Sequence, residues 1–143
     1  MTTETAPRLF TREEAERTLP LVRRIVADLM AEHPAWRRAI SHYEILAAGA
    51  VADEGETPEV RAARLEAERL AAQIDRYLRE IEQIGCMFQG FEEGLVDFRT
   101  MRDDRMILLC WRYGEERISH WHEVGAGFAA RKPIDDALLS EVG

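Results

Sequence analysis

The sequence predicts an α+β fold in which a long antiparallel helical hairpin is followed by a small four-stranded antiparallel meander. Apolar residues recur with steps of four and three over 22–47 and again over 60–84, which indicates two amphipathic helices. The segment between them, AGAVADEGET at 48–57, is small and acidic, as hairpin tips are. After Gly85 the pattern changes to short apolar runs separated by turn residues, which predicts strands.

The chain is expected to form a single domain over residues 1–143. Residues 10–85 make up the helical part, with the hairpin tip near 48–57, and residues 86–134 make up the antiparallel sheet and a C-terminal loop. A chain of 143 residues is long enough to bury a core without the help of disulfides or metal ions.

Local signals mark where the helices begin and end. Thr11 and Glu14 have the spacing of a capping box, which predicts a helix start. Pro20 lacks an amide hydrogen, so we expect the first helix to be short and a second to begin at Pro20, capped by Thr18. Pro34 predicts a kink, or a break and restart. Thr57 followed by Pro58 is a strong start for the second arm of the hairpin.

Four strands are expected in the second half of the chain, at 86–88, 95–99, 106–112 and 117–123. The turns between them contain Glu93-Gly94, Arg102-Asp103-Asp104 and Gly114-Glu115. A short helix is expected at 135–141.

Charge and composition exclude several classes of function. Nineteen basic and 27 acidic residues give a net charge of −8, which repels phosphate backbones, so we expect neither a nucleic-acid partner nor an anionic membrane surface. The start MTTETAPRLF has no apolar signal region, and no stretch approaches the ~20 apolar residues of a membrane span. Two cysteines are too few for a disulfide scaffold, so a reducing, cytoplasmic location is expected.

The length of the hairpin predicts self-association. Each long helix would span about 40 Å, whereas short strands can cover only about half of that length. The sheet should dock at the open end, near Pro20 and Ile84. The far half, with Trp36, Tyr43 and Ala67, would then remain partly uncovered, so we expect a homodimer in which two hairpins form a four-helix bundle.

The run His120-Trp121-His122-Glu123 is the densest cluster of functional side chains. Residues two apart on a strand share a face, so His120 and His122 could begin a site for zinc, iron or nickel. The third ligand would be Cys110 or Asp97, or Glu123 if the strand has ended by then.

The turn after Tyr113 decides the register of the metal candidates. A three-residue turn places Cys110 opposite His120, whereas a two-residue turn led by Gly114 places Leu109 there instead. Glycine at the first central position favours the shorter turn.

A small enzyme is a further alternative, with a pocket between the sheet and the C-terminal loop. The candidate binding residues are Asp97, Trp121, Glu123 and Arg131, and His122 would join them in an enzyme. The sequence contains no P-loop, GxGxxG, HExxH or nucleophile-elbow pattern, so no catalytic residue is assigned.

Four segments resemble one bacterial family: EEAERTLPLV (13–22), GLVDF (94–98), LLCWRYGE (108–115) and WHEVGAGFAARKPI (121–134). The chain is similar to the domain of unknown function 2203 from about Leu9 to Ile134. The resemblance implies a helical pair plus a sheet and brings no established activity or catalytic residues. The sequence departs from the family pattern at Gln89-Gly90, Arg99 and Ala130.

The sequence therefore supports three functions, in this order. The first is a dimeric scaffold or interaction domain, the second is a transition-metal-binding protein using His120 and His122, and the third is the small enzyme.

Overall fold

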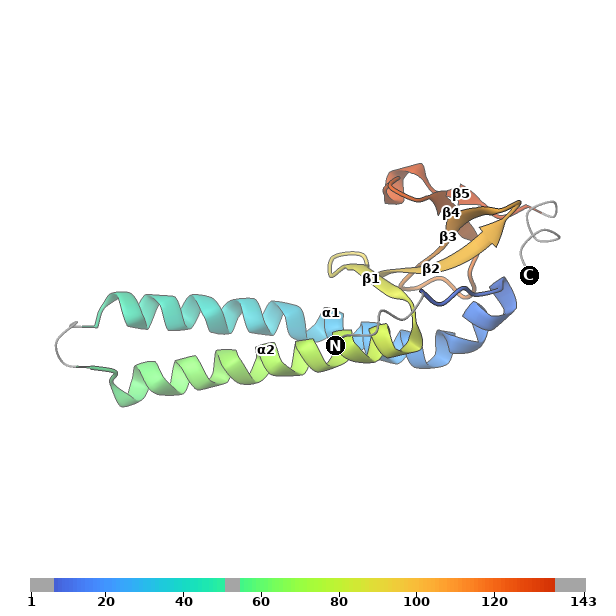
Figure 1. Cartoon of the computed structure of the whole chain (residues 1–143). Coiled ribbons are helices and arrows are strands. Elements are labelled where there is room, and N and C mark those ends of the chain that lie inside the picture. Colours follow the sequence, from blue (N-terminus) through green and yellow to red (C-terminus); the bar gives the residue numbers. More distant parts are fainter. Residues whose placement is uncertain (1–6, 51–54, 136–143) are drawn as a thin grey trace, which may run out of the picture.

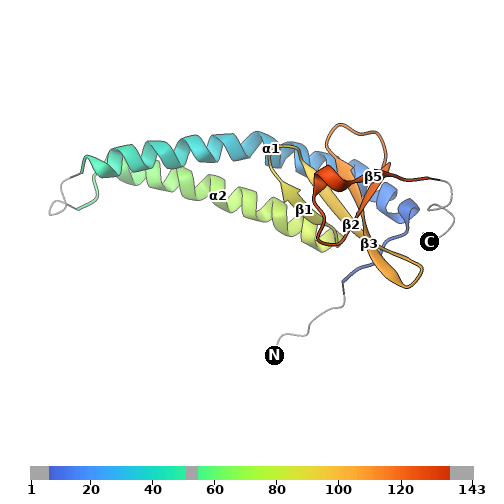
Figure 2. The same cartoon turned by 90° about the horizontal axis from the view of Figure 1, so that it is seen from above.

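The structure is a computed structural model that describes residues 7–50 and 55–135, and it confirms the α+β fold class. Two long helices, α1 (Arg12–Ala48) and α2 (Pro58–Ile84), form the antiparallel hairpin. An antiparallel sheet lies over one end of this hairpin, as both views show (Figures 1 and 2). Its strands are β1 (Met87–Gly90), β2 (Leu95–Arg102), β3 (Arg105–Arg112), β4 (His120–Glu123) and β5 (Lys132–Pro133).

The helix ends follow the local signals in the sequence. The Thr11 side chain accepts a hydrogen bond from the Glu14 amide at 3.0 Å, and the Thr11 amide donates to the Glu14 carboxylate at 2.9 Å, which completes the capping box. The Thr57 side chain caps α2 by accepting a hydrogen bond from the Val60 amide. Gly85 ends α2 with a φ of 105°, a left-handed conformation that costs glycine little.

The prediction of a helix break at Pro20 was wrong, because α1 continues through both Pro20 and Pro34. Each proline is exposed, and Leu19 and Val22, which flank Pro20, are almost fully buried. Burial of this apolar face outweighs the one hydrogen bond that a proline removes. The Thr18 hydroxyl donates to the Ala15 carbonyl within the helix at 2.7 Å instead of capping a new one. Figure 1 shows that the first turns of α1 are inclined to the rest of the helix, as expected for a helix bent at a proline.

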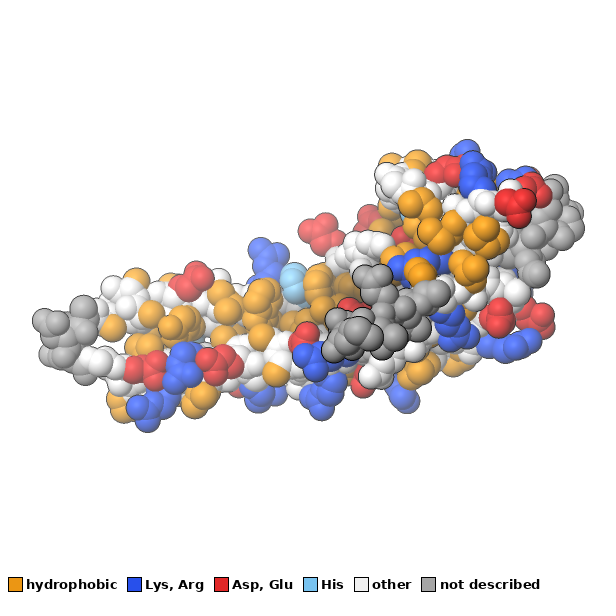
Figure 3. All heavy atoms as spheres, viewed as in Figure 1, with side chains coloured by type: hydrophobic (Ala, Val, Ile, Leu, Met, Phe, Trp, Pro, Cys, Tyr) orange, Lys and Arg blue, Asp and Glu red, His pale blue; other side chains and the backbone are white. Residues whose placement is uncertain are grey.

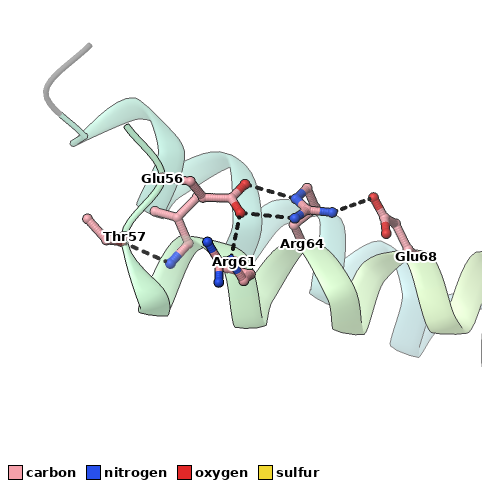
Figure 4. Close-up of polar contacts among 6 residues, drawn as sticks. Glu56, Thr57, Arg61, Arg64 and Glu68 are labelled. Carbon is pink, nitrogen blue, oxygen red and sulfur yellow. Dashed lines mark hydrogen bonds and ion pairs between the residues drawn. The ribbon is translucent and has the colours of Figure 1, made fainter. Parts of the chain in front are cut away.

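An exposed charge network surrounds the first turns of α2 at the hairpin tip (Figure 4). The Glu56 carboxylate accepts hydrogen bonds from Arg61 and Arg64, and Arg64 also donates to Glu68 at 3.1 Å. Exposed pairs of this kind contribute little to stability, so the network mainly fixes the side chains at the start of the helix.

The sheet has five strands in the order β1-β2-β3-β4-β5 in the described part of the chain, where four were predicted. The additional strand, β5, lies in the segment predicted as a C-terminal loop and pairs with β4 at the sheet edge. It escaped prediction because it has only two residues and contains Pro133, which an edge position tolerates. The helix predicted at 135–141 falls almost entirely on residues outside the described ones.

One face of the sheet packs on the hairpin and forms the core. Its central side chains are fully buried, namely Val96, Phe98, Ile107, Leu109 and Trp111. Phe10 extends this core from the segment before α1: its ring packs edge-on against Phe98 at 5.2 Å, and its amide donates to the Arg99 carbonyl. The sheet therefore docks at the open end of the hairpin, as the chain connection at Gly85 predicts.

The far half of the hairpin is less well covered. No residue of α1 after Leu29 is buried, and Trp36 and Tyr43 are partly exposed as expected. Ala67, which was expected to be partly exposed as well, is buried at 4% exposure against α1. No helix in residues 7–50 or 55–135 has the length and apolar character needed to cross a membrane.

Candidate functional site

Three buried polar side chains meet on the face of the sheet that points away from the helices. Asp97 of β2, Cys110 of β3 and His122 of β4 lie on neighbouring strands, and their ligand atoms all fall within 4.8 Å of one another. Their exposed fractions are 3%, 1% and 5%. Buried groups of this kind need partners, so their hydrogen bonds decide what the cluster can do.

The strand register brings the three residues together. Asp97 pairs directly with Cys110, and Cys110 pairs with His120, so the side chains of Asp97, Cys110 and His120 point to one face of the sheet. His122 follows two residues later and shares that face. The favoured two-residue turn, which would place Leu109 opposite His120, is wrong: Cys110 pairs with His120 and Leu109 with Trp121. The connection between β3 and β4 is longer than either predicted turn, over residues 113–119, and so does not fix the register as a tight turn would.

The hydrogen bonds of His122 determine where its ring protons lie. Nδ1 is 2.9 Å from the Glu123 carbonyl oxygen, which can only accept, so Nδ1 carries a proton. Nε2 is 3.1 Å from Asp97 Oδ1. The contact between Nε2 and the Asp97 carboxyl therefore holds one shared proton.

Burial raises the pKa of the Asp97 carboxyl above its ordinary value, although the nearby His122 and hydrogen bonds from Cys110 and Gln89 oppose this. Burial together with the negative charge of Asp97 raises the pKa of the Cys110 thiol to about 12. Burial therefore penalises the charged form of both groups.

Arg131 approaches the same cluster from the segment before β5. Its guanidinium is within hydrogen-bonding reach of the Cys110 sulfur. It also forms a bidentate ion pair with Glu115, in which the two guanidinium nitrogens lie 3.0 and 2.8 Å from the two carboxylate oxygens. The Glu115 carboxylate in turn lies 3.4 Å from His120 Nδ1. This chain of contacts places a fixed, charge-balanced pair beside the thiol.

A cavity of about 490 Å³ opens beside the three residues. It lies between the sheet and the segment that follows β4, which Figure 1 shows on the side of the sheet away from the hairpin. Its floor contains Asp97, Cys110 and His122, and the remaining walls are formed largely by Gln89, Leu95, Leu108, residues 125–127 and Phe128. Its volume is typical of a site for a small molecule.

The other predicted site residues lie around this cluster rather than in it. His120 contacts Ser119 at 2.9 Å and stays outside the group of three. Trp121 points to the opposite face and joins the core, with Lys132 over its ring. Glu123 forms an ion pair with Arg105 at 3.0 Å.

Three residues near the site were not identified from the sequence. Gln89 reaches Asp97 from β1, where the pairing with β2 shifts between Phe88 and Gly90, and nothing in the sequence marks such an irregularity. Phe128 stands in a glycine-rich segment that carries no periodic signal. Glu115 is in a turn, and only its tertiary pairing with Arg131 reveals its position.

The geometry does not support a cysteine nucleophile. Both ring nitrogens of His122 are engaged, with the Glu123 carbonyl and with Asp97, so neither can take a proton from Cys110. The raised pKa of the thiol also disfavours a reactive thiolate.

Comparison with protein families gives one result: the model of a family described as "Uncharacterized conserved protein (DUF2203)" matches residues 8–134. The chain belongs to the DUF2203 family. Searches of curated proteins and of solved structures give no match. The family description assigns no activity, so function in this DUF2203 chain has to be argued from the site itself.

Proposed function

We propose that this DUF2203 protein binds one transition metal ion through Asp97, Cys110 and His122. The observation that carries the proposal is the convergence of a carboxylate, a thiol and an imidazole from three adjacent strands, all buried and within 4.8 Å of one another. A bound cation would offset the penalty that burial places on the charged forms of the Asp97 carboxyl and the Cys110 thiol.

The donor set suits a borderline metal such as zinc, iron, cobalt or nickel. Imidazole, thiolate and carboxylate are all common ligands of Zn²⁺, at about 2.0–2.3 Å. Tetrahedral geometry at those distances requires ligand atoms roughly 3.3–3.8 Å apart. His122 Nε2 and Asp97 Oδ1 are 3.1 Å apart, and no two ligand atoms of the group are more than 4.8 Å apart. Small side-chain rotations are enough to bring these distances into the tetrahedral range.

The surroundings of the ligands support the same proposal. The Glu123 carbonyl holds Nδ1 of His122 and leaves Nε2 to face Asp97, which is the orientation that metal-binding histidines usually have. Arg131 stands beside Cys110, where its charge would stabilise a thiolate ligand. Because a metal must displace the proton of the Cys110 thiol, whose pKa is raised to about 12, its affinity should rise with pH.

The test is the metal content of full-length protein purified without an affinity tag or chelator. We expect close to one transition metal ion per chain in the wild type. The variants His122→Ala and Asp97→Ala should lose it, whereas His120→Ala, which removes a neighbouring imidazole outside the group, should keep it. Cobalt substitution adds a direct readout, since a thiolate-to-cobalt charge-transfer band should be present in the wild type and absent in Cys110→Ser.

Two results would contradict the proposed metal site. One is wild-type protein without metal that also fails to take up added Zn²⁺ or Co²⁺. The other is equal metal loss in His120→Ala and His122→Ala, because then the ligands would not be the three proposed.

A second proposal concerns the hairpin, which we infer to pair with a second copy of the chain. Ile45 and Leu65 are 72% and 50% exposed on its far half, and Figure 3 shows hydrophobic side chains along this arm between charged ones. The part of α1 beyond Met30 has 18 residues and a length of about 27 Å. Two such hairpin faces, each about 20 Å wide, would bury on the order of 1,000 Å² in total, near the lower limit for a specific dimer.

Light scattering coupled to size-exclusion chromatography tests this pairing. The wild type should have the mass of a dimer at micromolar concentration, and Ile45→Glu or Leu65→Glu should reduce it to a monomer. Val124→Glu is the control, because Val124 is similarly exposed but lies after β4, far along the chain from the hairpin. A monomeric wild type would refute the pairing without affecting the metal proposal.

A further inference from the structure

The cavity next to Asp97, Cys110 and His122 is lined by polar and apolar parts that adjoin each other. Leu95, Leu108 and Phe128 supply the apolar surface, and Leu108 pairs with His122 across β3 and β4. The remaining polar lining side chain is the Gln89 amide, which donates a hydrogen bond to Asp97. A ligand that fits both parts needs a polar head and an apolar body.

The number of protein ligands matters as much as their identity. Within residues 7–50 and 55–135, no fourth histidine, cysteine, aspartate or glutamate joins the group of three. Structural zinc sites are closed by four protein ligands, whereas sites with three keep one position for water or a substrate. The cavity adjoins the three ligands directly, so that position has space on its outer side.

We propose that the metal ion keeps one coordination position open toward the cavity, and that a small ligand with an oxygen donor and an apolar group binds there. This inference rests on the metal binding proposed above and adds the class of ligand to it. The oxygen donor coordinates the metal, and the apolar group lies against Leu95, Leu108 and Phe128.

The charges of the site favour a neutral or singly negative ligand. A carboxylate and a thiolate together balance a divalent metal ion, and the nearby Arg131 is balanced by Glu115. The Gln89 carboxamide carries two N–H donors and Asp97 takes one of them, so the other can donate to a ligand oxygen. A highly charged phosphate ligand finds no unbalanced cation among the residues that line the described cavity.

Phe128 provides the means to test the apolar part separately from the metal. Its ring lines the cavity and lies 4.7 Å from the Arg131 guanidinium, but it offers no metal-binding atom. Phe128→Ala should therefore leave metal affinity unchanged and weaken only ligands with an apolar group. Val124→Ala is the matched control, because Val124 belongs to the same connection but does not line the cavity.

The experiment uses full-length protein loaded with Co²⁺, whose visible spectrum reports the coordination sphere. Acetohydroxamate and benzohydroxamate share the oxygen donors and differ in the apolar group, so they are titrated in parallel. We expect both to change the cobalt spectrum, with benzohydroxamate binding about tenfold more tightly. Phe128→Ala should remove most of that tenfold preference, and Val124→Ala should keep it. Cobalt content is measured after each titration to separate ligand binding from metal extraction.

The possible outcomes of this titration separate metal binding, the open coordination position and the apolar group. If the protein binds no cobalt, the proposed function itself is wrong. If cobalt binds with its thiolate band but neither hydroxamate changes the spectrum at millimolar concentration, or if both only extract the metal, the site is closed and this inference is overturned. Equal affinity for the two probes would overturn the assignment of an apolar group.

Discussion

Gly94 is the position where one methyl group should reveal how tightly the sheet is docked on the hairpin. It precedes β2, the strand that carries Asp97, and has a φ of 67°. A Cβ at this position would stand 2.7 Å from the Met30 sulfur, 2.8 Å from Tyr113 Cβ and 3.0 Å from Val26 Cγ1. Gly94→Ala therefore introduces both backbone strain and a clash.

The magnitude follows from these two effects. An alanine in the left-handed region costs about 1–2 kcal/mol relative to glycine. Overpacking by one methyl costs about 1–3 kcal/mol more where the neighbours cannot move. Met30 can rotate away, but Val26 is fully buried and Tyr113 Cβ is fixed to the backbone. The total loss in the free energy of unfolding should be about 2–5 kcal/mol.

Gly114→Ala is the matched control for this prediction. Gly114 also has a left-handed φ, of 104°, but a Cβ there would meet no atom within 4 Å. It should therefore show the backbone cost alone, about 1–2 kcal/mol. Chemical denaturation of both variants beside the wild type measures the difference, which we expect to be at least about 1 kcal/mol. Equal losses in the two variants would refute the close packing of the sheet against α1.

Two further predictions concern the metal-free site. Asp97→Asn should stabilise the chelated protein at pH 7, because burial raises the pKa of the carboxyl above 3.8 and so penalises its charged form. The gain in the free energy of unfolding is present above the pKa of the carboxyl in the unfolded state and absent below it. The denaturation curves of variant and wild type should therefore separate at pH 7 and converge at about pH 3. Coinciding curves at pH 7 would contradict it. Burial also raises the pKa of the Cys86 and Cys110 thiols to about 12. At pH 8 the thiols of the native metal-free protein should therefore react with a disulfide reagent on the order of a thousandfold more slowly than those of the unfolded chain. One fast thiol per native chain would show that the buried environment of Cys86 or of Cys110 is wrongly described.

Much of the fold was predictable because its signals act over a few residues. The capping box at Thr11, the Thr57-Pro58 start and the Gly85 stop each depend on hydrogen bonds within one turn. The prolines of α1 show where such signals fail. Pro20 is a helix breaker locally, but the burial of Leu19 and Val22 against the sheet and α2 keeps the helix continuous.

The candidate site was predictable in its residue types but not in its membership. Asp97, Cys110 and His122 were all named as possible ligands, since their chemistry can be seen in the sequence. The choice of His122 over His120 depended on the orientation of each imidazole ring. The Glu123 carbonyl orients the ring of His122, whereas Ser119 and Glu115 orient the ring of His120.

Periodicity and capping are local properties, so the amino-acid sequence was enough to predict the two long helices, the change to strands after Gly85 and the residue types that carry chemistry. The register of β3 and β4, the short fifth strand and the cavity beside the three candidate ligands depend on tertiary packing. Register is decided by which face of every strand is buried at once, and no single segment contains that information.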